Sequence, residues 1–229
     1  SWVAPHYQSV FQFLRDPEIF ACYSSLDYGT DADGAASFQL HFVSFEDPPN
    51  VWTWDEHYLQ GRFLQEQAVT YARCIEEFPE TYVRGYADPS LKGKADEGIS
   101  RLAKFRDEGV HFVAAVNDRI EGWGTLDHFL AYSLDDNGEF VRRPRWRIHQ
   151  RCGNLHRALA SAPRDSVRLE DVSKQFKKDH SLDSARYFLH SHFRGASRPA
   201  ERPSVLTGAG IRERRKEESR RAARAAGFW

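Results

Sequence analysis

Apolar residues recur along this chain with two different periods, and each period predicts one type of secondary structure. In residues 36–45, Phe38, Leu40 and Phe42 alternate with other residues, which predicts a β-strand. The short apolar run at residues 110–116 lies between turn residues and predicts a second, buried strand. These are the only two predicted strands, so the expected β element is small.

Apolar residues at steps of three and four positions predict helices through most of the first half. The strongest pattern covers residues 55–78 and ends at Pro79, which cannot continue a helix. Shorter helices are predicted at residues 5–15, 96–108 and 125–134. The polar segments 27–35 and 117–124 are predicted to be loops.

Three further helices are predicted in the second half. The first begins at Arg142, within RRPRWRIHQR, and runs to about Ser161. The second covers roughly residues 168–178. The third begins at Ser181, a favourable N-cap residue, and ends near Gly195, a favourable residue after a helix. Three short helices in succession predict a small helical layer.

The chain after Gly195 changes in composition. Residues 196–210 are rich in Pro, Ser and Gly and predict a linker or extended arm, and residues 211–226 predict a polar helix. The expected fold is therefore mainly α (α+β). It consists of an acidic α+β domain (1–141), a basic helical layer (142–195) and an extended arm that ends in a helix (196–229).

Charge divides the chain into two unlike halves. Residues 1–141 carry 10 Lys or Arg and 24 Asp or Glu, whereas residues 142–229 carry 22 and 9. The basic half contains 18 Arg, which forms bidentate contacts with phosphate and carboxylate groups. This half is predicted to bind an anion: acidic faces of protein subunits, anionic lipid headgroups or RNA. The residues expected to make this contact are Arg142, Arg143, Arg145, Trp146, Arg147, Arg151, Arg212, Arg214, Arg215, Arg220, Arg221 and Trp229.

Motifs for metal binding are weak. Asp31, Asp33 and Gly34 resemble part of a calcium-binding loop, but Gly29 and Leu40 occupy the two positions that require carboxylates. A polar turn is the preferred interpretation.

A second metal candidate lies in the basic half. His149, Cys152 and His156 share one face of the predicted helix, and imidazole and thiolate are zinc ligands. Several neighbouring Arg residues disfavour a cation, so these three remain weak candidates. Partly buried side chains in a helical layer are the preferred interpretation.

Catalytic motifs are also absent. Glu121, Asp127 and His128 lie around a Gly-Trp-Gly turn and could act as acid–base groups. The chain has no nucleophile elbow, phosphate-binding loop or dinucleotide-binding pattern. We therefore predict no enzymatic activity, no catalytic residue and no cofactor.

The cysteines and the N-terminal residue bear on the cellular compartment of the protein. Cys22, Cys74 and Cys152 are odd in number and widely spaced, which favours a reducing compartment. No run approaches about 18 consecutive apolar residues, so no transmembrane segment is expected. The chain begins at Ser1 and contains no Met. Removal of a targeting peptide and loss of an initiator Met both remain open.

These features favour a non-catalytic, structural accessory subunit of a large organellar assembly. The specific hypothesis is a peripheral subunit of a mitochondrial respiratory-chain complex or ATP synthase. It would dock through protein–protein contacts on the matrix side of the inner membrane. One alternative is a mitochondrial ribosomal protein that binds rRNA through residues 142–229. A second alternative is an enzyme of unknown class that uses the 121–128 segment or the face formed by His149, Cys152 and His156.

Overall fold

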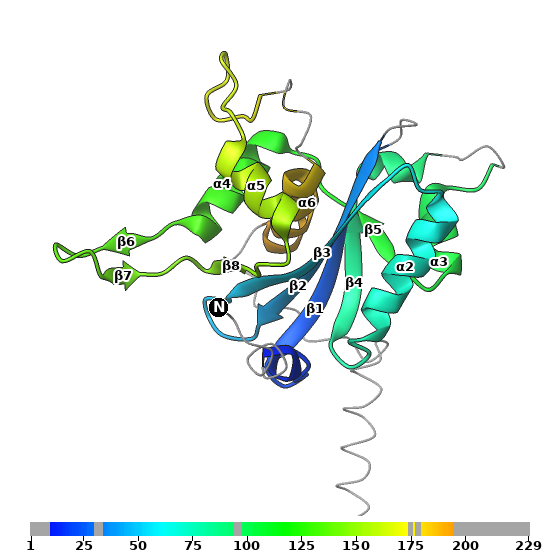
Figure 1. Cartoon of the computed structure of the whole chain (residues 1–229), viewed down its shortest axis with the longest axis horizontal. Coiled ribbons are helices and arrows are strands. Elements are labelled where there is room, and N and C mark those ends of the chain that lie inside the picture. The colour runs from blue at the N-terminus through cyan, green and yellow to red at the C-terminus, as the bar shows by residue number, and fades with distance from the viewer. Residues whose placement is uncertain (1–9, 30–33, 94–97, 174–175, 177–179, 195–229) are drawn as a thin grey trace, which may run out of the picture.

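The structure, a computed structural model, describes residues 10–29, 34–93, 98–173, 176 and 180–194. Its centre is a six-stranded mixed sheet with the strand order β5-β4-β1-β2-β3-β8. Helices cover both faces of the sheet (Figure 1). The predicted mainly α fold is therefore wrong, because the chain has an α/β fold organised around a sheet.

The sheet combines an antiparallel meander with parallel strands at both edges. β1 pairs with β2 and β2 with β3 in antiparallel fashion. β4 runs parallel to β1, β5 runs parallel to β4, and β8 runs parallel to β3. The strands are β1 (Phe20–Tyr28), β2 (Ala35–Ser44), β3 (Val51–Gln60), β4 (Tyr82–Ala87), β5 (Phe112–Ala114) and β8 (Trp146–Ile148).

The helices form one layer on each face of the sheet, and a hairpin projects from the body (Figure 1). One layer contains α2 (Leu64–Glu76), α3 (Arg101–Asp107) and the 3-10 helix η1 (Pro89–Lys92). The other contains α4 (Arg119–Leu130), α5 (Gly153–Ser161) and α6 (His180–Phe193). The hairpin consists of β6 (Ser133–Leu134) and β7 (Phe140–Arg142).

The central strand β2 shows how sequence and burial correspond. All ten of its residues are buried, because helices cover both sides. Phe38 and Phe42 pack into the core beneath α2 and α3. Gln39 and His41 point to the opposite side, where they form hydrogen bonds with buried polar groups. The alternation that predicted this strand therefore separates an apolar core from a polar, hydrogen-bonded layer.

The predicted helix at residues 55–78 is wrong in its first part. Residues 51–60 form β3, Gly61 has a positive φ of 63°, and the helix starts only at Leu64. Pairing with β2 and β8 gives the backbone of this segment its hydrogen bonds. The aromatic residues Trp52 and Trp54 suit a strand, so tertiary pairing outweighs the helical spacing of the apolar residues.

The predicted helix from Arg142 to Ser161 is also wrong in its first part. This segment forms the end of β7 and then β8, and α5 begins only at Gly153. Pro144 explains the difference, because proline lacks a backbone N–H and disfavours helical geometry in the preceding residue.

Two further expectations are corrected, and two strands were not predicted. The predicted loop 117–124 forms the start of α4, where the Asp118 carboxylate caps the helix by accepting from the Glu121 N–H. The helix predicted at roughly residues 168–178 is not found in its described first part, because residues 168–173 are not helical. Strands β1 and β4 have no counterpart among the predicted elements. The strands predicted at 36–45 and 110–116, and the last helix of the basic half, are present as β2, β5 and α6.

Two sets of predictions concern residues outside the described part of the chain. They are the arm at residues 196–229 and the polar turn at Asp31 and Asp33. Within the described ranges, no helix has both the length and the hydropathy needed to cross a membrane.

Candidate functional site

Three carboxylates converge at the carboxyl ends of the interior strands β1 and β4. Asp27 lies near the end of β1, and Asp88 directly follows the neighbouring parallel strand β4. The Asp88 N–H donates to the Leu26 carbonyl at 2.9 Å, which places the two aspartates side by side. Asp183 comes from the first turn of α6, which packs across this face. Carboxyl ends of parallel strands are a common location for ligand sites in α/β sheets.

The three carboxylates interact electrostatically. Burial is the main cause that raises the pKa of Asp27 to about 6, and the charges of Asp183 and Asp88 raise it further. A hydrogen bond from His180 opposes this shift. Burial and the same three carboxylates also raise the pKa of Tyr187. Like charges this close are favourable only beside compensating positive charge.

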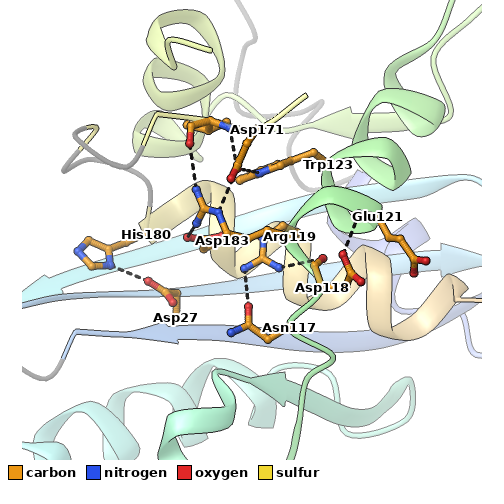
Figure 2. Close-up of polar contacts among 11 residues, drawn as sticks. Asp27, Asn117, Asp118, Arg119, Glu121, Trp123, Asp171, His180 and Asp183 are labelled. Atoms are coloured by element: carbon orange, nitrogen blue, oxygen red, sulfur yellow. Dashed lines mark hydrogen bonds and ion pairs between the residues drawn. The ribbon is translucent and has the colours of Figure 1, made fainter. Parts of the chain in front are cut away.

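The chain itself supplies that positive charge (Figure 2). His180 Nδ1 lies 2.6 Å from Asp27 Oδ2. Arg186 Nε donates to Asp183 Oδ1 at 2.7 Å, and Arg119 Nη1 donates to Asp183 Oδ2 at 3.2 Å. Both buried carboxylates therefore have a basic partner from this chain.

Arg119 connects this site to the segment that follows α5. Its Nε donates to Asp171 Oδ1 at 3.1 Å, and its Nη2 donates to the Val172 carbonyl at 3.3 Å. Trp123 Nε1 donates to the same Asp171 oxygen at 2.8 Å. Burial alone would raise the pKa of Asp171, but the hydrogen bonds from Trp123 and Arg119 hold it below its ordinary value. Arg119 thus joins two carboxylates, one in the site and one beside it.

Arg186 is the most deeply buried of these basic side chains, with 1% of its surface exposed. Besides Asp183, its guanidinium donates to the Asp118 carbonyl and to Asn117 Oδ1 at 3.4 and 3.1 Å. Gly122 makes room for it, because a Cβ at that position would lie 2.7 Å from Arg186 Cγ. Helices α4 and α6 can therefore pack closely with the guanidinium between them.

A buried chain of hydrogen bonds holds α6 against the sheet. Ser184 Oγ lies 2.8 Å from Ser25 Oγ, which lies 2.8 Å from His41 Nε2. His41 Nδ1 lies 2.9 Å from Thr53 Oγ1, which accepts from Trp146 Nε1 at 2.7 Å. Burial is the main cause that lowers the pKa of His41 to about 3, so this side chain is neutral. This series of hydrogen bonds positions helix α6, which carries Asp183, and links the helix to β8.

The donor set has the chemistry of a divalent-cation site. Carboxylate oxygens are the ligands that Mg²⁺ and Mn²⁺ prefer, and a cation would relieve the repulsion that Asp27 experiences. Within the described residues, no group of three or more His, Cys, Asp or Glu side chains is arranged to hold a metal ion. Asp27 and Asp183 are instead oriented toward His180 and the two arginines.

The predicted anion-binding residues do not form one group in the structure. Arg142, Arg143 and Arg147 are exposed and Arg145 is half-buried, all near the base of the hairpin and on β8. Trp146 is buried, and its indole N–H donates to Thr53 Oγ1 in the buried hydrogen-bond chain described above. Arg151 Nη2 lies 3.5 Å from Asp55 Oδ2. The remaining residues of this prediction, Arg212, Arg214, Arg215, Arg220, Arg221 and Trp229, lie outside the described residues.

The weak metal candidates have other contacts. Cys152 is buried with Sγ 3.6 Å from the Thr53 carbonyl. The His149 ring lies 4.4 Å from the Trp54 ring, and His156 Nε2 lies 3.2 Å from the His149 carbonyl.

The residues at the predicted Gly-Trp-Gly turn do not converge either. Glu121 lies 3.8 Å from His190, and His128 contacts Arg145. Asp127 is exposed on α4.

The sequence-based prediction missed Asp27, Asp88, Asp183, Arg119 and His180. A usable signal was present for the first two, because each aspartate ends a strand-like run, FACYSSLD and YVRGYAD. Asp183 gave a weaker signal, since it is a buried carboxylate within an apolar helical pattern.

The fold and this site can be compared with solved structures. The large terminase of a thermophilic bacteriophage superimposes with a TM-score of 0.57 and 19% identity, covering 75% of this chain and 39% of the terminase. Another crystal form of that terminase gives a TM-score of 0.56, 22% identity and coverages of 75% and 40%. The nuclease domain of the P22 large terminase gives a TM-score of 0.53 and 14% identity, with coverages of 76% and 82%. No protein-family model matches the chain, and no curated protein matches it in sequence.

These similarities establish the fold and correct the functional expectation. The chain has an α/β fold similar to that of the P22 terminase nuclease domain, and it spans about two fifths of the thermophilic phage terminase. The prediction of a non-catalytic accessory subunit of a respiratory complex or ATP synthase is therefore wrong. The prediction that the chain is not an enzyme is also contradicted by this fold.

Proposed function

We propose that the chain is a nuclease module that hydrolyses phosphodiester bonds of nucleic acid with the aid of a divalent cation. The convergence of Asp27, Asp88 and Asp183 at the ends of β1 and β4 and in α6 carries this proposal. The fold similarity to the P22 nuclease domain supports it.

The charge at the site explains why a cation is required. A phosphodiester is anionic, and three carboxylates would repel it. To hold a divalent cation together with Asp88, Asp27 and Asp183 would have to turn away from His180 and the two arginines. The cation would then neutralise this repulsion and polarise the phosphate. The three side chains offer oxygen ligands of the appropriate kind.

The surrounding residues position the carboxylates and offer a contact for the substrate. Arg186 and the buried hydrogen-bond chain fix α6, and with it Asp183. The Arg119 side chain is 27% exposed and also contacts Asp171, so it can bind a phosphate oxygen without losing both of its carboxylate partners.

The test is cleavage of plasmid DNA and of RNA by the purified chain with Mg²⁺ or Mn²⁺. We expect cleavage that EDTA abolishes. Asp27→Asn and Asp183→Asn should each lower the rate by about 100-fold or more, because each removes a cation ligand. Asp127→Asn is the matched control, since Asp127 is an exposed aspartate on α4, away from the ends of β1 and β4.

The control variant should cleave within about twofold of the wild-type rate. Circular dichroism and thermal melting would confirm that all three variants fold. The proposal is wrong if neither nucleic acid is cleaved with either cation. It is also wrong if both site variants cleave as fast as the control.

A further inference from the structure

Four arginines form a strip along the end of β7 and along β8, at the edge of the sheet. We call Arg142, Arg143, Arg145 and Arg147 the basic strip. Among the residues that the structure describes, no carboxylate forms an ion pair with any of these four. The described part of the fold therefore leaves the positive charge of the strip without a carboxylate partner.

Aromatic rings hold three of these arginines in place. The guanidinium carbon lies 5.0 Å from the Phe140 ring centroid for Arg143 and 4.6 Å from that of Phe129 for Arg145. For Arg147 the distance to the Trp52 ring is 4.9 Å. Cation–π contacts orient a guanidinium without cancelling its charge, so its N–H groups remain available to an anion.

The pKa values of two groups at the strip, Arg145 and His128, are lowered in part by the positive charge of nearby arginines. Burial lowers the pKa of Arg145, and the charge of Arg142 lowers it further. Burial also lowers the pKa of His128, with added contributions from Arg145 and Arg142.

The acidic residues of the hairpin lie at its tip. Asp135, Asp136 and Glu139 belong to the turn, and the Asp135 carboxylate closes this turn by accepting from two backbone N–H groups. The strip begins where the returning strand β7 ends.

The strip lies at the opposite end of β3 from the carboxylates. Asp27 pairs with Ser37, and Ser37 pairs with Tyr58, so Tyr58 marks the level of the carboxylates on β3. Val51, at the start of β3, pairs with Trp146 in the strip. The seven residue-to-residue steps from Val51 to Tyr58 span about 23 Å along the strand, at about 3.3 Å per step. A nucleic-acid duplex covers this length with about seven base pairs, at about 3.4 Å per base pair.

We propose that the basic strip is a second nucleic-acid contact, which binds the phosphate backbone of a duplex about seven base pairs away from the bond at the carboxylates. The inference that the strip binds nucleic acid depends only on the four arginines. The spacing to the cleaved bond rests on the proposed nuclease function.

A phosphate backbone fits the strip better than an acidic protein surface does. A duplex carries charge continuously along its length, and Arg is suited to bidentate phosphate contacts. The strip also follows an extended chain segment rather than surrounding a pocket, so it matches a linear polyanion. An acidic protein remains a distinct outcome of the test.

The test is the binding of fluorescently labelled duplex DNA to the full chain in EDTA, which separates binding from cleavage. The variant Arg142→Gln/Arg143→Gln/Arg147→Gln removes three exposed charges and keeps the packed Arg145. The matched control, Arg62→Gln/Arg73→Gln/Arg106→Gln, removes three exposed charges from the region of α2 and α3. Both variants change the net charge equally.

We expect the strip variant to bind at least about tenfold more weakly at low salt and the control to bind within about twofold of wild type. The slope of log K against log salt should decrease by about 0.9 for each phosphate that the variant no longer binds. Equal affinities and slopes for the two variants would overturn the proposal. So would competition by poly-glutamate that matches competition by unlabelled duplex, because that result indicates an acidic protein partner.

Duplex length tests the spacing. Wild-type affinity should rise steeply as the duplex grows past about seven base pairs, and this rise should flatten in the strip variant. Parallel length dependences would overturn the two-point contact. Weakened binding by the strip variant, together with an absence of cleavage by wild type, would retain the strip and reject the nuclease function.

Discussion

The carboxylate site and the basic strip both gather like charges, but among the described residues opposite charge is supplied only to the first. Asp27 and Asp183 have His180, Arg119 and Arg186 as partners. The arginines of the strip contact aromatic rings and, within the described residues, no carboxylate. The carboxylates carry charges that must be neutralised within the folded protein. The arginines of the strip carry charges that remain available to a ligand.

Burial explains this difference. Asp27 and Asp183 are 7% and 8% exposed, so an unpaired charge at either position would lose its hydration with nothing in return. The strip lies at an exposed edge, where water solvates an arginine without a partner. Substitutions in the two regions should therefore separate into effects on stability and effects on binding.

The largest expected effect on stability belongs to Arg186. Arg186→Gln should lower the free energy of unfolding by about 3–5 kcal/mol, because it leaves Asp183 with a weaker set of partners inside the protein. Urea unfolding followed by circular dichroism measures this loss. If the variant is too unstable to purify, its yield of folded protein relative to Arg147→Gln reports the same effect. A loss below about 1 kcal/mol would remove the contrast between the two regions.

Arg119 should show an intermediate effect. Arg119→Gln should cost about 2 kcal/mol, since Asp183 keeps Arg186 and Asp171 keeps Trp123. The melting temperature in EDTA measures it. Adding Mg²⁺ should recover more stability in this variant than in wild type, because the cation then competes with one guanidinium for Asp183 instead of two. An equal increase in both proteins would count against that competition.

His41 offers a third case, a buried titratable group that is kept neutral rather than paired. Its pKa is about 3 in the folded chain against an ordinary value of 6.5, so below pH 6.5 the unfolded state binds a proton that the folded state does not. Stability should fall as the pH decreases from 6.5 toward 3. His41→Gln should remove part of this slope, which is worth up to about 1–2 kcal/mol between pH 6.5 and 5.

Urea unfolding of both proteins at several pH values in that window measures the His41 effect. The carboxylates are present in both proteins and contribute equally to both curves of stability against pH. Only the difference in slope between the two curves therefore reports on His41. Parallel curves would mean that His41 is protonated in the folded protein.

The smallest effect on stability belongs to the strip. Arg147→Gln should change the free energy of unfolding by less than about 0.5 kcal/mol, because its side chain is exposed and forms no ion pair with any described residue. Chemical denaturation measures it, with Arg73→Gln as the control. A loss comparable to that of Arg119→Gln would show that the Trp52 contact is a structural interaction of the fold.

The sequence revealed some of these features because their signals are local. Charge counting identified the segment that forms the basic strip, periodicity identified β2 and α6, and a short apolar run between turn residues identified β5. Strands β1 and β4 escaped because their identity depends on pairing between segments near residues 22 and 82. The three aspartates come from three distant segments with no shared motif. Their convergence is a property of sheet topology, which spacing along the chain does not express.

The buried hydrogen-bond chain from Trp146 to Ser184 has a direction. An indole N–H can only donate, so Thr53 Oγ1 accepts from Trp146 and its own hydroxyl proton is free to donate to His41 Nδ1. When Thr53 donates to Nδ1, neutral His41 carries its proton on Nε2 and donates to Ser25, which can then donate to Ser184. This arrangement uses each intervening group once as donor and once as acceptor. The hydrogen-bond chain thereby links one tryptophan at the sheet edge to the tautomer of a histidine in the core and to the hydroxyl orientations that reach helix α6.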